Sequence, residues 1–108
     1  EMSVKELKAL LDAKGDEVLL LDVRNPHEWD IAQIPGAVLV PLPDIESGEG
    51  VEKVKSLLNG HELVVHCRSG VRSAKALGIL KESGINGTNV AGGILAWSEE
   101  IDPSVPQY

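Results

Sequence analysis

Cysteine is almost absent from this sequence, which contains one, Cys67, among its 108 residues. A single thiol excludes a disulfide within the chain and a zinc site built from several cysteines. No spacing of His, Cys and acidic residues is typical of a metal site either, so we expect no metal and no cofactor. A lone thiol is typical of a reducing compartment, and we expect a cytoplasmic protein. Chemistry that needs a second thiol must obtain it from another molecule.

Aromatic residues and long apolar runs are also scarce. The chain has two Trp, one Tyr and no Phe, yet 43% of it is hydrophobic, which predicts a folded domain with an aliphatic core. No apolar run reaches the ~18 residues of a membrane helix, and residues 1–12 are amphipathic rather than continuously apolar like a signal peptide. We expect one domain over residues 1–108. Because the chain begins with Glu1 rather than Met, it is compatible with a processed or tagged chain or an excised domain.

Positive charge is in short supply, with 10 Lys and Arg against 17 Asp and Glu and a net charge of -7. This balance disfavours nucleic acids and anionic membranes as partners. Two of the few arginines, Arg68 and Arg72, nevertheless lie within six residues of Cys67. An acidic chain that gathers its guanidinium groups beside its one thiol indicates that these groups serve the thiol.

Short apolar runs alternate with amphipathic stretches along the chain. We predict strands over residues 18–23, 38–40, 63–66 and 89–91. We predict helices from a Ser3–Glu6 capping box to Gly15, from an Asn25 cap with Pro26 onward, and over residues 51–58, 73–83 and 94–99. Residues 41–50 are predicted to be a polar loop, and the tail from Pro103 to be extended. Such alternation favours an α/β fold of three layers, a mostly parallel central sheet with helices on both faces.

The segment around Cys67 carries the chemistry. A buried strand is predicted to end at Cys67, and a helix to start at about Ser73, so the thiol lies where parallel sheets bind ligands. Free N–H groups and the helix dipole stabilise a thiolate there and lower its pKa, and Gly70 lets the loop curl so that its N–H groups point inward. We therefore predict that Cys67 is a nucleophile and that the following residues bind substrate: Arg68, Ser69, Gly70, Val71, Arg72 and Ser73.

His66 is not expected to act as a base. It precedes Cys67 on the strand, so its side chain is predicted to point away from the thiol and to form a hydrogen bond in the core. Activation of Cys67 is therefore assigned to loop N–H groups, the helix dipole and the two arginines.

Four segments together resemble the rhodanese homology domain over nearly the whole chain. They are Leu21-Asp22-Val23-Arg24, Ile34-Pro35-Gly36-Ala37, His66-Cys67-Arg68-Ser69-Gly70-Val71-Arg72-Ser73-Ala74, and Ala91-Gly92-Gly93 with Trp97. The resemblance implies a small α/β fold and a persulfide carried on Cys67, with Asp22 and Arg24 as supporting residues that frame the loop. Gln33 stands where many members have His, and we expect this to alter a supporting hydrogen bond rather than the chemistry.

The end of the chain resembles a narrower group. Residues 97–108, together with Trp29-Asp30-Ile31, are similar to the C-terminal rhodanese domains of adenylyltransferase–sulfurtransferase fusions of molybdopterin, thiamine and tRNA thiolation. The resemblance implies these partners: a small sulfur donor such as thiosulfate or a persulfide, a cysteine desulfurase, a ubiquitin-like sulfur carrier and a fused adenylating domain. The expected function is therefore a sulfurtransferase.

Two alternatives remain in view. Tyrosine-type phosphatases of related fold use Cys, five residues and then Arg, whereas here the residue after five is Ser73 and Arg72 comes one position early. The loop is thus one residue short for gripping a phosphate. Non-catalytic binding modules of the rhodanese type commonly lose the cysteine, which this chain retains.

Overall fold

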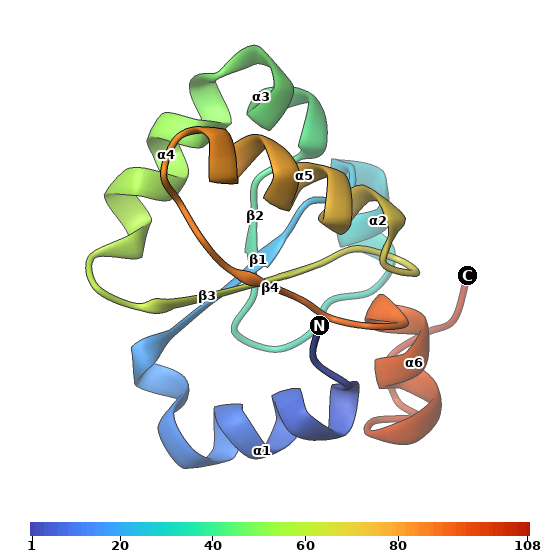
Figure 1. The fold of residues 1–108 in the computed structure, drawn as a ribbon. Helices are drawn as coiled ribbons and strands as arrows, with labels where there is room; N and C mark the ends of the chain where they lie inside the picture. Colours follow the sequence, from blue (N-terminus) through green and yellow to red (C-terminus); the bar gives the residue numbers. More distant parts are fainter.

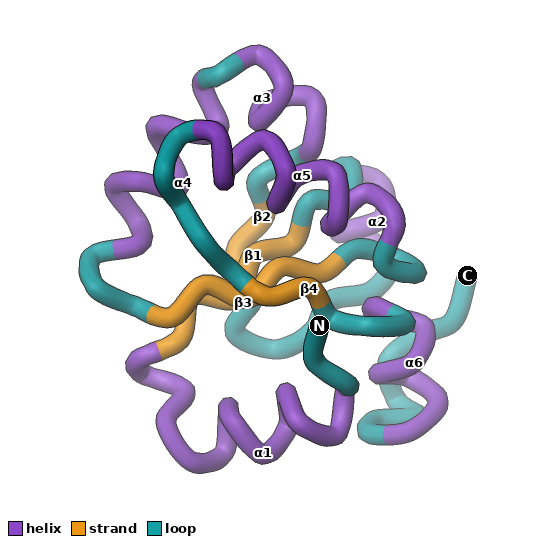
Figure 2. Tube along the Cα trace, in the orientation of Figure 1, coloured by secondary structure: helices purple, strands orange, loops and turns teal.

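A computed structural model describes all of residues 1–108, and helices and strands alternate along it (Figure 1). The elements are α1 (Val4–Lys14), a 3-10 turn η1 (Gly15–Glu17), β1 (Val18–Asp22), α2 (Pro26–Ile31), β2 (Val38–Leu39), α3 (Leu42–Ser47), α4 (Glu49–Leu58), β3 (Glu62–His66), α5 (Val71–Glu82), β4 (Thr88–Asn89) and α6 (Gly93–Glu100). The four strands form one parallel sheet in the order β2-β1-β3-β4, drawn in orange in Figure 2.

The alternation of side chains along the strands creates a separate core on each face of the sheet. Leu19 and Leu21 of β1 join a cluster that includes residues of α3, α4 and α5, whereas Leu20 joins the cluster of α1 and α6. Successive strand residues point to opposite faces, so an almost continuous apolar run serves both layers. Figure 1 shows the same division, with α1 and α6 on one side of the sheet and α3, α4 and α5 on the other. The predicted three-layer α/β fold is confirmed.

Local sequence signals set the first two helices as predicted. Ser3 and Glu6 form the capping box that starts α1, which ends before Gly15. Asn25 and Glu28 form a second capping box at the start of α2, with Pro26 in its first turn. In a capping box the two side chains satisfy backbone N–H groups that have no partner inside the helix. The second box also fixes where Glu28 lies, which matters for the site below.

The prediction of a polar loop over residues 41–50 is wrong. The segment forms α3 and the start of α4, separated by Gly48 with a φ of 95°. Leu42 and Ile45 are buried in the core, and Pro43 lies in the first turn, where its missing N–H would have had no helical partner. Burial of two apolar positions thus outweighed the polar and glycine-rich composition that suggested a loop.

Several element boundaries also differ from the prediction by one or two residues. The helix after Cys67 begins at Val71 rather than Ser73, and α6 begins one residue early. The outer strands β2 and β4 have only two residues each. Beyond β4 the chain pairs with the N-terminal segment instead, because Ala91 N donates to Met2 O at 2.8 Å. None of the helices combines the length and apolar character needed to cross a bilayer.

Candidate active site

Cys67 lies directly after β3, at the edge of the sheet where the parallel strands end, as the sequence predicted. The loop is short, since α5 begins at Val71 and Gly70 precedes it with a φ of 113°. The start of α6 supports the loop from behind: Ile94 N donates to Cys67 O at 2.9 Å, and Leu95 N donates to Arg68 O at 3.2 Å. The carbonyl groups of Cys67 and Arg68 therefore point toward α6, and the N–H group of Gly70 points toward the thiol.

The approach of α6 to the loop requires a glycine. A Cβ atom on Gly93 would lie 2.5 Å from the carbonyl oxygens of both Cys67 and Arg68, and the residue has a φ of +56°. Only glycine combines this close approach with a positive φ at little cost. The Gly92-Gly93 turn therefore sets the position of the loop that carries Cys67.

The thiol is buried and surrounded by hydrogen-bond donors. Cys67 is 1% exposed, and its Sγ accepts a hydrogen bond from Gly70 N–H at 3.1 Å and lies 3.3 Å from Ser73 Oγ. Burial raises the pKa of the thiol, but hydrogen bonds from the Ser73 hydroxyl and from backbone N–H groups, including those of Gly70 and Ser69, outweigh it and lower the pKa of Cys67. The loop therefore favours the thiolate, the nucleophilic form.

Asn89 belongs to the same network, although no feature of the sequence pointed to it. Ser73 Oγ donates to Asn89 Oδ1 at 2.6 Å, and Asn89 Nδ2 donates to Gly70 O at 3.1 Å. The side chain from β4 thus holds both a loop carbonyl and the hydroxyl that contacts the thiol. No local pattern marks Asn89, because its partner in α5 is 16 residues away.

Asp22 and Arg24 form a buried ion pair at the end of β1. Both side chains are fully buried, and Arg24 Nη2 donates to Asp22 Oδ2 at 2.7 Å. Arg24 also donates to Ala32 O at 2.6 Å, so the pair ties β1 to the end of α2. Neither side chain has a hydrogen bond to the thiol, so their supporting role stays a prediction.

His66 is fully buried, as expected of a core residue. Its Nδ1 lies 3.3 Å from Cys67 O, and its Nε2 lies 3.8 Å from Asp22 Oδ2. Burial lowers the pKa of His66 despite the nearby carboxylate, so the ring is neutral at ordinary pH. It has no hydrogen bond to the thiol, and the site contains no Cys–His pair.

Arg68 in the loop and Arg72 in the first turn of α5 have partners that sequence reasoning missed. Arg72 binds both carboxylate oxygens of Glu28, with Nη2 to Oε2 at 2.8 Å. These hydrogen bonds are the main reason why the pKa of Glu28 falls to about 2, and they raise the pKa of Arg72. The only sequence signal for Glu28 was its place in the capping box of α2. A carboxylate therefore offsets part of the positive charge that the sequence assigned to the loop.

Arg68 is bound by the end of the chain. Its Nε donates to Tyr108 O at 3.0 Å, its Nη2 donates to the same oxygen, and its guanidinium carbon lies 5.0 Å from the centre of the Tyr108 ring. The tail, predicted to be extended, instead turns after α6 and is anchored by buried Val105, whose carbonyl accepts from Ser98 Oγ at 2.6 Å. The end of the chain therefore lies against the Cys67 loop through the contact between Tyr108 and Arg68.

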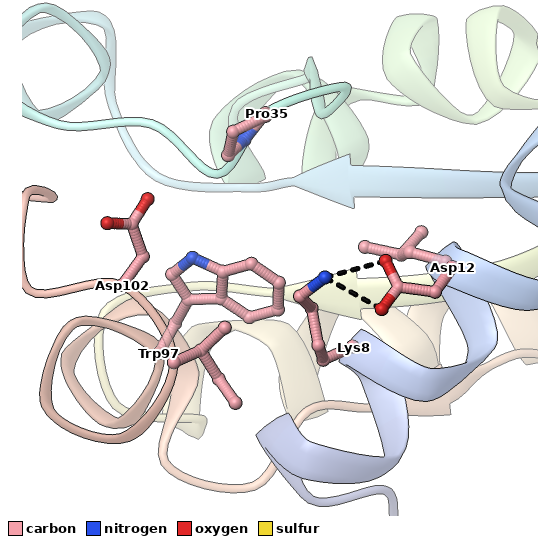
Figure 3. A pocket seen from close by; sticks show the side chains of 7 residues that line it. Lys8, Asp12, Pro35, Trp97 and Asp102 are labelled. Atoms are coloured by element: carbon pink, nitrogen blue, oxygen red, sulfur yellow. Dashed lines mark hydrogen bonds and ion pairs between the residues drawn. The ribbon is translucent and has the colours of Figure 1, made fainter.

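The largest hollow in the molecule lies elsewhere. A groove of about 370 Å³ runs between α1, α6 and Pro35, beside the Lys8–Asp12 ion pair (Figure 3). Trp97 is 4% exposed and forms one wall of the groove. No hollow is lined by the Cys67 loop, so the chemical site is distinguished by its donors and not by its size.

Cys67 lies just beyond the carboxyl end of the central strand β3, where backbone N–H groups surround its buried thiol. The chain is thus an α/β domain with one cysteine in a place suited to nucleophilic chemistry. The profile of the family described as Rhodanese-like domain matches residues 3–100. The chain belongs to this family, which confirms the resemblance seen in the sequence.

Individual relatives carry sulfurtransferase names. The chain is 42% identical over 105 residues to the probable adenylyltransferase/sulfurtransferase MoeZ of Mycobacterium tuberculosis, covering 96% of this chain and 26% of that protein. It is 38% identical over 103 residues to the putative sulfurtransferase YtwF of Bacillus subtilis, covering 95% and 94%. The crystal structure of a rhodanese-like domain protein from Staphylococcus aureus matches with a TM-score of 0.77 and 31% identity over 99% of this chain and 96% of that one. The chain spans about a quarter to a half of the length of several curated relatives.

Proposed function

We propose that this chain is a sulfurtransferase that carries a sulfane sulfur atom as a persulfide on Cys67. The observation that carries the proposal is the pair of contacts at Cys67 Sγ, the Gly70 N–H at 3.1 Å and Ser73 Oγ at 3.3 Å. Donors placed around a buried sulfur stabilise an anion, and a persulfide is an anion at neutral pH like the thiolate before it. Membership of a family with sulfurtransferase-named relatives supports the same activity.

The reaction has two displacements on one sulfur atom. The Cys67 thiolate attacks the outer sulfur of thiosulfate, a new S–S bond forms, and sulfite leaves with the electron pair of the broken S–S bond. A persulfide donor reacts in the same way and leaves as a thiolate. A nucleophilic acceptor then attacks the outer sulfur of the Cys67 persulfide, and the thiolate of Cys67 is regenerated as the leaving group. Because the chain has one Cys, the acceptor comes from another molecule.

The loop residues have separate roles in this proposal. Backbone N–H groups of Ser69, Gly70 and Ser73 hold the thiolate and the persulfide that replaces it. Val71 is 75% exposed at the start of α5, where it contacts an approaching donor or acceptor. Arg68 and Arg72 attract an anionic donor by their positive potential. The contacts of Arg68 with Tyr108 and of Arg72 with Glu28 reduce that potential.

The physiological partners are proposed on the naming of relatives. Several are called adenylyltransferase and sulfurtransferase, so we propose a cysteine desulfurase as donor, a ubiquitin-like carrier as acceptor and an adenylating domain, fused or separate. In that reaction the outer sulfur of the Cys67 persulfide attacks the adenylated C-terminus of the carrier, AMP leaves, and an external thiol reduces the resulting acyl disulfide, which releases the carrier thiocarboxylate and leaves Cys67 in a mixed disulfide with the thiol. Mixing persulfidated protein, an adenylating enzyme, ATP, the carrier and a thiol should therefore yield a carrier thiocarboxylate that mass spectrometry detects. Discharge of the persulfide by small thiols without any thiocarboxylate would favour a general thiosulfate sulfurtransferase.

Substitution of Cys67 tests the catalytic assignment. The variant Cys67→Ser keeps the fold, since a hydroxyl is nearly as large as a thiol, but cannot form the persulfide. After incubation with thiosulfate, intact mass spectrometry should show a gain of one sulfur, about 32 Da, in the wild type alone. The same gain in the variant would place the sulfur elsewhere and contradict the assignment. No gain in the wild type would favour a non-catalytic binding module.

A further inference from the structure

The last residue of the chain connects four charged side chains around the Cys67 loop. The Tyr108 hydroxyl accepts from Arg24 Nη1 at 2.8 Å and donates to Glu28 Oε2 at 2.8 Å. Glu28 in turn holds Arg72, and Tyr108 O accepts both hydrogen bonds from Arg68. Tyr108 therefore contacts Arg24 after β1, Glu28 on α2 and Arg68 in the Cys67 loop. Through Glu28 the network also includes Arg72 on α5.

The contact with Arg68 occupies the part of the guanidinium that binds oxyanions. The Nε and Nη2 groups form one edge of the planar fork, the edge that a carboxylate or sulfonate grips with two parallel hydrogen bonds. Here both groups point to the main-chain oxygen of Tyr108, while the ring lies 5.0 Å from the guanidinium carbon. An anion that is to bind Arg68 through this edge must first displace Tyr108.

Tyr108 can leave without unfolding the tail. The tail is held separately by Ser98 Oγ, which donates to Val105 O at 2.6 Å, and by the buried side chain of Val105. The Tyr108 side chain itself is only partly buried. Movement confined to residues 106–108 would therefore expose the Arg68 edge and leave the core as it is.

We propose that Tyr108 determines donor specificity by competing with anionic donors for the guanidinium of Arg68. The proposal rests on the proposed function, because it concerns the donor that loads Cys67. With Tyr108 docked, donors that need no cation reach the thiol unaffected, whereas a donor with a sulfonate group must displace the tail. Any partner that holds the tail away would shift the preference toward anionic donors.

Alkylation of Cys67 tests this independently of sulfur transfer. Iodoacetate and iodoacetamide have the same reacting carbon and differ in charge, so the ratio of their rates reports the positive potential at the thiol. Tyr108→Ala keeps the main-chain oxygen but removes the ring that lies on Arg68 and the hydroxyl that binds Arg24 and Glu28. Residue 108 is then no longer anchored at Arg68, so the ratio should rise about threefold, the size of effect expected from a partly exposed charge interaction. In an Arg68→Ala background the same substitution should leave the ratio unchanged. An unchanged or lower ratio in Tyr108→Ala, or an equal rise without Arg68, would overturn the proposal.

Steady-state loading gives the second readout. Tyr108→Ala should lower KM for thiosulfate about threefold with little change in kcat, and loading from an uncharged persulfide should be unaffected. Equal losses with both donors would instead show that Tyr108 supports the loop geometry, and would refute competition. If the wild type takes up no sulfur while the alkylation ratio shifts as expected, the proposed function fails and the role of Tyr108 on Arg68 stands.

Discussion

Removal of the Ser73 hydroxyl should separate the reactivity of the thiol from the stability of the fold. Ser73 Oγ has one proton and two acceptors, Asn89 Oδ1 at 2.6 Å and Cys67 Sγ at 3.3 Å. While the thiol is protonated, the hydroxyl donates to Asn89 and can accept from the S–H group. When the thiol ionises, the hydroxyl can turn and donate to the thiolate, and Asn89 Oδ1 loses its donor.

The size of the effect follows from this exchange. A hydrogen bond to a charged group contributes about 1.5–3 kcal/mol, and the neutral bond given up costs about 1 kcal/mol. The net loss in Ser73→Ala is thus about 0.5–2 kcal/mol, so the pKa of Cys67 rises and alkylation by iodoacetamide near neutral pH slows by roughly two- to thirtyfold. Asn89 is 8% exposed, and its unpartnered oxygen should lower the free energy of unfolding by about 1–3 kcal/mol.

The measurements are the pH dependence of alkylation and urea unfolding, with Asn89→Ala as the matched control. The control removes the competing acceptor, so it should destabilise the fold by a similar amount without raising the pKa of Cys67. If the pH dependence of alkylation in Ser73→Ala equals that of the wild type, despite the expected loss of stability, the role given to the hydroxyl is refuted. A raised thiol pKa in both variants would point to general loosening of the loop instead.

Two further substitutions, Glu28→Gln and Gly93→Ala, test the surroundings of the loop, and Gly78→Ala serves as the control for the second. Glu28→Gln removes the carboxylate that binds Arg72. Because the pKa of Glu28 is lowered from 4.5 to about 2, the carboxylate stabilises the fold fully above pH 4.5. In urea unfolding the wild type should therefore be more stable than the variant at neutral pH, and this difference should disappear as the pH falls toward 2. A stability difference that persists at pH 2 would contradict this. Gly93→Ala forces a Cβ to within 2.5 Å of two loop carbonyls, so it should slow alkylation of Cys67 and destabilise the fold by about 1–3 kcal/mol. Gly78→Ala in α5 meets no atom within 4 Å and should stabilise by about 0.5–1 kcal/mol with unchanged alkylation.

The sequence by itself determined the layers of the fold and the place of Cys67 between a buried strand and a helix. Both depend on local signals: the period of apolar residues, the capping boxes at Ser3 and Asn25, and a cysteine loop between a buried strand and a helix. These signals act over a few residues, so they can be recognised without knowing what lies across the sheet. The same reasoning failed over residues 41–50, because helix α3 depends on the burial of Leu42 and Ile45 against distant elements.

Only the tertiary structure decided how the site is charged and held. Glu28 lies 44 residues before Arg72, and Tyr108 lies 40 residues after Arg68, so no local pattern connects the partners. The sequence places two arginines beside a thiol but does not show their partners. In the folded chain Arg72 binds the carboxylate of Glu28, and Arg68 binds the main-chain oxygen of Tyr108. Asn89 joins the thiol network for the same reason, since β4 runs parallel to β3 and places its side chain beside Ser73. Electrostatics at a site depend on distances in space, and those distances are set by packing of the whole chain.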